Sequence, residues 1–195
     1  IETPIVYTDL KTAELIKYSA NAFLAVKISF INQMADLCEK VGADVHDVAR
    51  GMGLDKRIGS KFLHPGPGYG GSCFPKDTLA LIQTAKLYDT DISIVETVVQ
   101  YNQKRKSDMA DKIIKIFNGK TQNKKISILG LAFKPGTDDM RDSPALDIIP
   151  KLKKAGFKIS AFDPVSMKEA KLLLNDIVFS ENIEDCLKDA DALVI

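Results

Sequence analysis

The hydrophobic pattern of the chain changes its period near residue 120, and this change constrains the fold more than any other feature. Up to residue 117 apolar residues recur at helical spacing in long segments, whereas from residue 125 short apolar runs alternate with helical segments. The segment 118–123, Asn-Gly-Lys-Thr-Gln-Asn, is rich in turn formers and separates the two regions. Strands that alternate with helices are typical of a parallel, doubly wound sheet. We therefore predict an α/β protein in which an all-helical domain (1–118) precedes a Rossmann-like, doubly wound parallel-sheet domain (119–195).

The helical region begins with a segment, residues 10–40, that contains neither proline nor glycine. This segment predicts one long helix, with Thr8 or Asp9 as its N-cap. Its apolar residues fall on more than one face, so we expect the helix to be buried nearly all round, in a core or against a second subunit. Cys38 belongs to this apolar set and is expected to be a core thiol.

Three further helices are expected before residue 118. The first, 45–50, should be ended by the pair Gly51 and Gly53, and the others should span 77–88 and 92–117. The charged stretch 104–106 in the last helix is expected to be a solvated face.

Composition excludes several classes of function. The formal charge is +1 with both signs interspersed, so no nucleic-acid partner is expected. No apolar run approaches the length of a membrane span, and no signal peptide opens the chain. Three cysteines without CxxC spacing indicate a reduced, cytoplasmic protein, and two histidines without a Cys/His cluster predict no metal site. The abrupt start and the final run Ala-Leu-Val-Ile suggest a fragment of a longer polypeptide, incomplete at the end of its second domain.

The segment 62–78 has the most unusual composition, since it holds four of the twelve glycines and three of the eight prolines. Cys73 stands where this loop gives way to a helix-like run, and Pro75 suits the first turn of a helix. A cysteine outside a helix N-terminus with Lys76 nearby favours the thiolate, which is the nucleophilic form. A phosphate-cradling loop and a plain tight turn remain alternative interpretations at this point.

Two polar residues interrupt the apolar faces of the predicted long helix. Lys17 and Asn21 lie four residues apart and therefore share one face. A buried lysine is costly unless it meets an anion or a strong acceptor. The pair is thus either a functional site or a lysine that reaches solvent beside a surface asparagine.

The first strand of the second domain is followed by the loop 130–136, Gly-Leu-Ala-Phe-Lys-Pro-Gly, which does not fit G-x-G-x-x-G. Lys134 and Arg141 fall beyond the carboxyl end of this strand, where ligands of such sheets bind. A nucleotide diphosphate is therefore a plausible ligand. Asp163, after the next strand, could meet a ribose, although Asp-Pro is more often a turn.

Three segments of the chain resemble one enzyme family. Gly-Pro-Gly-Tyr-Gly-Gly-Ser-Cys-Phe-Pro-Lys-Asp (66–77) is similar to the active-site signature of the nucleotide-sugar 6-dehydrogenases, the UDP-glucose/GDP-mannose dehydrogenase family. Residues 13–21 resemble the family's central helix, and residues 130–144 resemble the opening of its UDP-binding domain. The three occur in family order, and the family's N-terminal NAD-binding domain is not represented among them.

The resemblance implies an oxidoreductase that oxidises a primary alcohol twice with NAD to reach a carboxylate. The lead-in Phe-Leu-His-Pro-Gly-Pro favours UDP-glucose, oxidised to UDP-glucuronate, over GDP-mannose or a UDP-N-acetylhexosamine. The chain alone, without the NAD domain, would be an inactive nucleotide-sugar-binding dimerisation module. A homodimer through the helical domain is implied, with Arg57 reaching the neighbouring subunit's site.

The resemblance also assigns site residues. Cys73 would be the nucleophile that forms a thiohemiacetal and then a thioester, with Lys17 and Asn21 stabilising an oxyanion. Asp77 would orient or deprotonate the hydrolytic water, or assist Lys17. Cofactor contacts fall on Lys76 and Arg141. The residues implied to contact the substrate are Lys17, Asn21, Arg57, Phe62, Leu63, His64, Pro65, Gly66, Pro67, Gly68, Tyr69, Gly70, Phe133 and Lys134.

Overall fold

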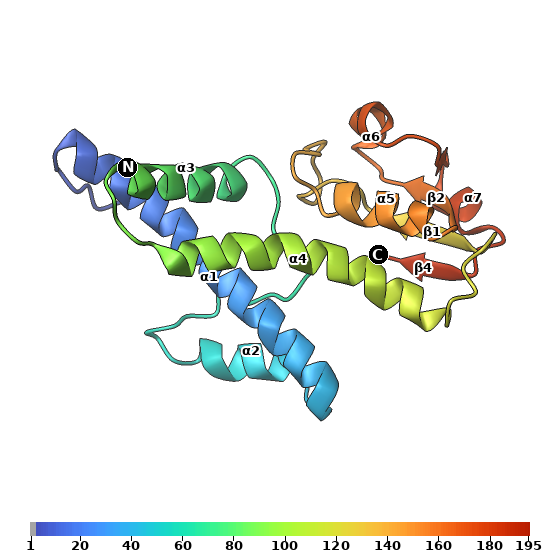
Figure 1. The fold of residues 1–195 in the computed structure, drawn as a ribbon, viewed down its shortest axis with the longest axis horizontal. Coiled ribbons are helices and arrows are strands. Elements are labelled where there is room, and N and C mark those ends of the chain that lie inside the picture. The colour runs from blue at the N-terminus through green and yellow to red at the C-terminus, as the bar shows by residue number, and fades with distance from the viewer. Residues whose placement is uncertain (1–2) are drawn as a thin grey trace.

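The computed structural model describes residues 3–195, and it is helical in its first half and carries a sheet with helices in its second (Figure 1). The fold class predicted from the sequence is confirmed, while the division at residues 118 and 119 stays a prediction. The helices of the first half are α1 (Leu10–Val41), α2 (Val45–Gly53), α3 (Phe74–Leu87) and α4 (Ser93–Ile116). The second half contains β1 (Lys125–Leu129), α5 (Ala145–Lys154), β2 (Lys158–Phe162), α6 (Met167–Leu173), β3 (Val178–Phe179), α7 (Ile183–Leu187) and β4 (Ala192–Val194).

Helix α1 is the single long helix that the absence of glycine and proline predicts. Asp9 caps it, because its carboxylate accepts the Thr12 backbone N–H at 3.1 Å, and Gly42 ends it with φ 75°. Cys38 is buried, as expected for a core thiol. Within the single chain several large apolar side chains of α1 are exposed, so that the core of this chain does not cover every face and burial against a second subunit stays a prediction: Leu15, Ile16, Phe23, Phe30 and Leu37.

Helix α2 corrects one expectation about glycine. It continues through Gly51 and ends at Gly53, instead of stopping at Arg50. A glycine in a helix costs only about 1 kcal/mol relative to alanine, which the rest of the helix can offset. Gly53 also has a packing role, since a Cβ there would lie 2.9 Å from the Cα of Ser60.

Helix α4 overturns the expectation of a solvated charged face at 104–106. Only Lys104 is exposed, whereas Arg105 and Lys106 are 4% and 3% exposed. Arg105 bonds to Asp36 of α1 at 2.5 Å, and Lys106 lies 3.3 Å from Asp147 of α5. The two cations are buried because they meet acceptors on other elements.

The four strands form one parallel sheet in the order β3-β2-β1-β4. The chain therefore moves outward from β1 to β3 and then crosses back to the other side of β1, which leaves a switch point between β1 and β4. Ligands of doubly wound sheets bind beyond the carboxyl ends of the strands at such a point. Among residues 3–195, no helix combines the length and the apolar character that crossing a membrane requires.

The larger core lies between this sheet, α5 and α4. Ile126 of β1, Ile149 and Leu152 of α5 and Ala110 of α4 are almost fully buried in it. The rings of Phe117 and Phe157 meet edge to face at 4.9 Å where α4 ends. The first turns of α4 therefore pack in the helical half, and its last turns pack in the core of the sheet half (Figure 1).

Asp163 fixes the carboxyl end of the sheet. Its carboxylate accepts backbone N–H groups of Leu131 (2.8 Å), Ala132 (3.2 Å), Val165 (2.9 Å) and Ser166 (2.8 Å). Burial raises the pKa of this carboxyl, but the four hydrogen bonds outweigh burial and lower the pKa to about 2. The Asp-Pro turn is thus the better interpretation of Asp163, because its oxygens are already engaged by the protein.

The lowered pKa of Asp163 predicts a loss of stability in acid. The ionised form stabilises the fold fully above pH 4 and stops doing so as the pH falls towards 2, which corresponds to about 2 kcal/mol. Asp163→Asn should lower the free energy of unfolding at pH 7 and flatten its change between pH 4 and pH 2. Chemical unfolding at several pH values measures both effects. Asp189→Asn, at an exposed position, is the matched control and should leave the acid slope of the parent protein in place.

Candidate active site

Cys73 lies where the loop 62–72 enters α3, and it is the exposed one of the three free cysteines. It occupies the N-cap position, and its carbonyl accepts the Asp77 N–H at 2.8 Å in the first helical turn. Pro75 stands in that turn, where a missing N–H costs nothing. Helix α3 therefore begins three residues earlier than predicted and carries the thiol at its N-terminal end.

Lys17, Asn21 and Asp77 form one hydrogen-bonded chain that joins α1 to the start of α3. Lys17 Nζ donates to Asn21 Oδ1 at 3.2 Å, and Asn21 Nδ2 donates to Asp77 Oδ2 at 2.5 Å. Asn21 and Asp77 are buried, while Lys17 remains exposed. The structure thus brings together three of the predicted catalytic residues, one helical turn from Cys73.

The first part of the loop is shaped by aromatic packing. Phe62 has φ 64°, a left-handed conformation that is rare for a bulky residue. The Phe74 ring meets the rings of Phe62 and Tyr69 edge on, at 6.0 and 5.9 Å. Leu63 is buried and His64 is exposed. Burial raises the pKa of Tyr69 to about 12, so this phenol is a neutral packing element.

The rest of the loop is held by polar side chains of α1 and α4. Asn32 Oδ1 accepts the Gly66 N–H at 2.8 Å, and Arg105 Nε donates to the Gly66 carbonyl at 3.0 Å. Asn102 pairs with both backbone groups of Tyr69, accepting at 2.8 Å and donating at 3.0 Å. The loop therefore has a fixed backbone without being a helix or a strand.

The paired glycines Gly70 and Gly71 allow this loop to touch the sheet half. A Cβ on Gly70 would lie 2.8 Å from the carbonyl carbon of Asp142, and one on Gly71 would lie 2.6 Å from Cδ1 of the Phe133 ring. The Gly71 N–H also donates to the Arg141 carbonyl at 2.8 Å. Only glycine permits this close approach.

The predicted cofactor cations flank the thiol and are exposed. Lys76 lies 3.5 Å from Asp77, and Arg141 bonds to Asp139 at 2.8 Å. The Asp139 carboxylate raises the pKa of Arg141, and a smaller contribution comes from the nearby Cys73. Arg57 is not brought to this site, since its exposed guanidinium is held by Asp55 at 2.6 Å.

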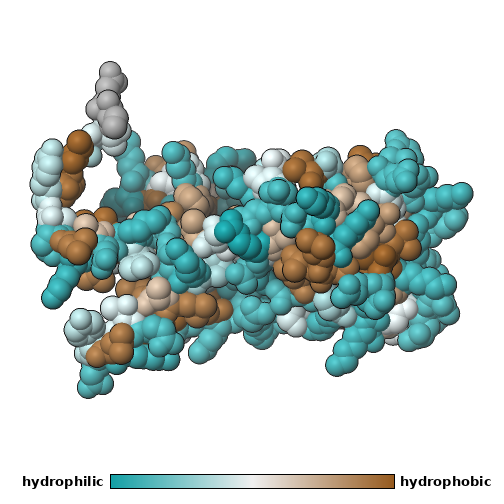
Figure 2. All heavy atoms as spheres, turned by 90° about the horizontal axis from the view of Figure 1, so that it is seen from above, coloured by the Kyte–Doolittle hydropathy of each residue, from teal (hydrophilic) through white to brown (hydrophobic). Residues whose placement is uncertain are grey.

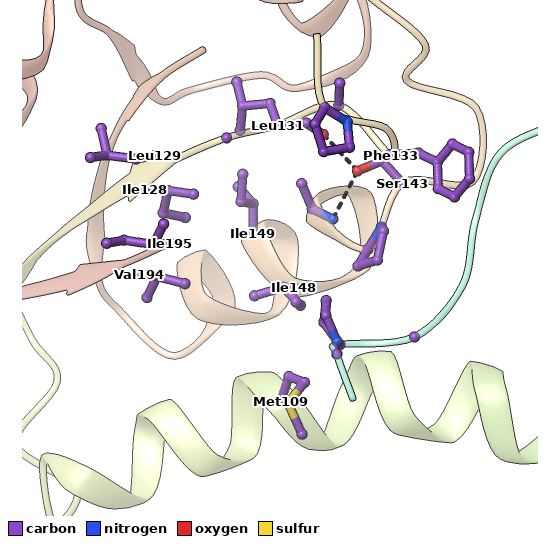
Figure 3. A pocket seen from close by; sticks show the side chains of 18 of the residues that line it. Met109, Ile128, Leu129, Leu131, Phe133, Ser143, Ile148, Ile149, Val194 and Ile195 are labelled. Carbon is purple, nitrogen blue, oxygen red and sulfur yellow. Dashed lines mark hydrogen bonds between the residues drawn. The ribbon is translucent and has the colours of Figure 1, made fainter. Parts of the chain in front are cut away.

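A cavity of about 990 Å³ opens at the switch point of the sheet, between β1, β4, α5 and α4 (Figure 3). Its walls are mainly apolar, with Met109, Ile148 and Ile149 pointing inward and the Ser143 hydroxyl bonded to the Leu131 carbonyl at 2.6 Å. The predicted substrate residues on its rim come from both halves: Pro65, Gly66, Pro67, Gly68, Phe133 and Lys134. Cys73 does not line the cavity, and Gly70 and Gly71 lie in the loop between the thiol and the rim residue Gly68.

Comparison with known proteins decides the family. Residues 11–104 match the central domain, and residues 127–195 the UDP-binding domain, of the UDP-glucose/GDP-mannose dehydrogenase family. The chain belongs to this family. A UDP-glucose 6-dehydrogenase of Rhizobium meliloti (strain 1021) is 55% identical over 194 residues, which cover 100% of this chain and 44% of that protein. UDP-glucose 6-dehydrogenase TuaD of Bacillus subtilis (strain 168) is 49% identical over 98% of this chain and 42% of its own length.

Solved structures of family members share the fold. A UDP-glucose dehydrogenase from the archaeon Pyrobaculum islandicum superposes with a TM-score of 0.92 at 35% identity, over 98% of this chain and 44% of that chain. A GDP-mannose dehydrogenase from Pseudomonas aeruginosa gives 0.58 at 25% identity, over 100% and 47%. The chain thus spans less than half of the length of these family members.

The sequence interpretation missed the residues that hold the loops of this family site: Asn32, Asn102, Arg105 and Lys106. Their signal was present, because Asn102 and Arg105 continue the inward spacing that runs from Val98 to Met109 on α4. Arg105 and Lys106 were expected to face water because they belong to a run of charged residues. Among residues 3–195, no group of three or more His, Cys, Asp or Glu side chains is placed to hold a metal ion.

The close approach at Gly70 predicts a large effect of a single methyl group. Gly70→Ala should force the Asp142 carbonyl away and lower the free energy of unfolding by about 2 kcal/mol. Gly51→Ala is the control, because that position in α2 has open space around it and alanine is the better helix former. Denaturant midpoints of the two variants measure the difference, and equal midpoints would show that the contact is dispensable.

Proposed function

We propose that the protein containing this chain is a cytoplasmic, NAD-dependent dehydrogenase that oxidises UDP-glucose to UDP-glucuronate. The observation that carries the proposal is the hydrogen-bonded chain Lys17–Asn21–Asp77 beside the exposed Cys73. Family membership and relatives named UDP-glucose 6-dehydrogenase support the substrate class. Free, widely separated cysteines agree with a reducing compartment.

The reaction removes four electrons from one carbon in two oxidations, with a covalent step between them. The first oxidation turns the primary alcohol into an aldehyde, which has no alkoxide oxygen from which to expel another hydride. Addition of the Cys73 thiolate to the aldehyde carbon makes a thiohemiacetal, and loss of hydride from this adduct gives a thioester. Water then breaks the carbon–sulfur bond, which releases the carboxylate and regenerates the thiol. NAD, when bound, accepts the hydride in each oxidation.

Lys17 and Asn21 are suited to hold the negative oxygen of the adduct. Lys17 uses one of three ammonium donors on Asn21, and Asn21 uses one of two amide N–H groups on Asp77. Both therefore keep donors for an oxyanion. The bonds to Lys17 and Asp77 fix which end of the Asn21 amide is the oxygen and which is the nitrogen. The second N–H of this nitrogen is the donor that we assign to the oxyanion.

Asp77 is suited to act on the water that hydrolyses the thioester. It is buried, it accepts from Asn21, and it lies in the first turn of α3, where the helix dipole favours a carboxylate. Its position one turn after Cys73 places both side chains on the same side of the helix. A carboxylate there can take a proton from water that attacks the carbonyl carbon of the thioester, with the Cys73 thiolate as the leaving group.

The two ligands fit separate features of the site. The UDP group would occupy the cavity at the switch point, against Phe133, Lys134 and the glycine-rich loop, whose small residues let a ligand approach the backbone. Lys76 and Arg141 are exposed cations beside the thiol and suit the negative charges of NAD. By itself the chain would be a nucleotide-sugar-binding module without turnover, because the family's NAD-binding domain lies outside these residues.

The covalent step predicts the behaviour of Cys73→Ser in the full-length protein. The parent protein should form two NADH for each UDP-glucose consumed, whereas the variant should lose net formation of UDP-glucuronate by at least about 10³-fold. NADH absorbance together with chromatography of the sugar nucleotides measures both. Cys38→Ala removes a buried thiol of α1 and should keep the two-to-one ratio. Normal glucuronate formation by Cys73→Ser would falsify the covalent mechanism.

We further propose that the protein is a homodimer through α1. Helix α1 exposes an apolar face that includes Phe23, whose side chain is 64% exposed. A helix on the surface of a soluble protein usually turns such a face inward, and large exposed apolar patches often mark interfaces. Apolar side chains gather over the helical half of the molecule as well as over the sheet half (Figure 2). The exposed guanidinium of Arg57, which the half-buried Asp55 holds, could then turn to the neighbouring subunit's site.

The dimer predicts the effect of a charge on this face. Phe23→Arg should convert the full-length protein from dimer to monomer, because an unpaired guanidinium cannot be buried in an apolar interface. Light scattering after size-exclusion chromatography gives the mass. Leu172→Arg, at an exposed leucine of α6, should leave the mass of the parent unchanged. A parent protein that is already monomeric at micromolar concentration would refute the interface.

A further inference from the structure

One face of α4 carries three polar side chains that are almost completely buried. Asn102, Arg105 and Lys106 stand at i, i+3 and i+4 and are 6%, 4% and 3% exposed. Burying an amide and two cations is costly unless each meets strong partners. Each of them meets a backbone carbonyl of a loop at the site, of Tyr69, Gly66 and Asp142 in turn. The two cations also meet carboxylates, Arg105 that of Asp36 and Lys106 that of Asp147.

The loop 65–72 depends on these contacts for its shape. Pro65 and Pro67 have no N–H, and the amides of Gly66, Tyr69 and Gly71 donate to Asn32, Asn102 and the Arg141 carbonyl. Each of these bonds crosses to another element, and none belongs to a helix or strand. The position of the loop that leads to Cys73 is therefore set from outside the loop.

Lys106 touches both loops at once. Its Cγ packs against Gly68, where an added Cβ would lie only 3.0 Å away. Its Nζ donates to the Asp142 carbonyl at 3.0 Å and lies 3.3 Å from the Asp147 carboxylate. The same Asp142 carbonyl abuts Gly70, so one side chain braces the contact between the glycine-rich loop and the loop 133–142.

We propose that Lys106 is a positioning residue that, together with Asn102 and Arg105, sets the spacing between Cys73 and the nucleotide-binding cavity. The inference rests on the proposed function, because one substrate would have to reach from that cavity to the thiol. An apolar side chain of similar length would fill the same space, so what the ammonium adds is the direction of its bonds. A reacting carbon displaced relative to the thiol reacts more slowly even when its nucleotide end is held.

The test compares Lys106→Met with Lys104→Met in the full-length protein. Methionine keeps most of the stem and removes the ammonium, and Lys104, two residues away, is exposed and bonded to Asp108. Hydrogen exchange of the peptide 65–72, followed by mass spectrometry, reports the loop without any ligand. Exchange of its protected amides should accelerate at least about fivefold in Lys106→Met and stay at the parent rate in Lys104→Met.

Steady-state kinetics supply the second measurement. In Lys106→Met, kcat should fall by about tenfold or more while KM for UDP-glucose stays within about threefold. Lys106→Arg, which restores a donor and a charge, should recover part of the loss. Equal exchange in the two methionine variants, or faster exchange with an unchanged kcat, would overturn the proposal.

Two further outcomes are distinguishable. If Lys106→Met does not fold, Asn102→Asp tests the same face, because it keeps the shape and the acceptor for Tyr69 N–H but removes the donor to Tyr69 carbonyl. It should accelerate exchange at Tyr69 and lower kcat, and an unchanged kcat contradicts the proposal. If the parent protein does not oxidise UDP-glucose, the proposed function fails, and unchanged exchange in Lys106→Met would separately exclude the bracing role.

Discussion

The contact between the glycine pair and the loop of the sheet half is the constraint on which the site depends. The Asp142 carbonyl and the Phe133 ring occupy the space that side chains at Gly70 and Gly71 would need. Because the backbones meet there, the thiol at the start of α3 and the carboxyl ends of β1 and β4 become parts of one surface. Each half provides only one end of the site. Under the proposed function, the contact between the halves sets how far the thiol lies from the cavity.

Near the thiol, two hydrogen bonds fix the orientation of the Asn21 amide. An asparagine amide can present either oxygen or nitrogen, and its pairing with Lys17 on one side and Asp77 on the other leaves one arrangement. The ammonium group of Lys17 can only donate, so the amide atom that it meets is the oxygen of Asn21. The carboxylate of Asp77 accepts, so the amide atom that it meets is the nitrogen of Asn21. Such a chain couples the orientation of a donor on α1 to the position of a carboxylate on α3, so the two helices cannot shift independently without disturbing it.

Most of the fold was predictable from the sequence because local signals decide it. The absence of glycine and proline gives α1, and the change of period near residue 120 gives the parallel sheet. The positions of Lys17, Asn21 and Asp77 followed from helical spacing and from the family resemblance. The partners of Arg105 and Lys106 could not be predicted, because they are carboxylates on other helices and backbone carbonyls of distant loops, and the carbonyls leave no trace in residue type. The sequence also does not say whether an apolar face of α1 meets its own chain or another, so the two alternatives for its burial could not be separated.

The continuity of helix α4 limits how the two halves can move relative to each other. It runs without interruption for 24 residues, packs on α1 and α3 at its beginning, and enters the core of the sheet half at its end. A hinge between the halves would have to break this helix or expose the cations buried along it. The continuous helix α4 thus holds the two halves in a fixed relative position. Any large motion in this part of the protein must therefore take place in its surface loops.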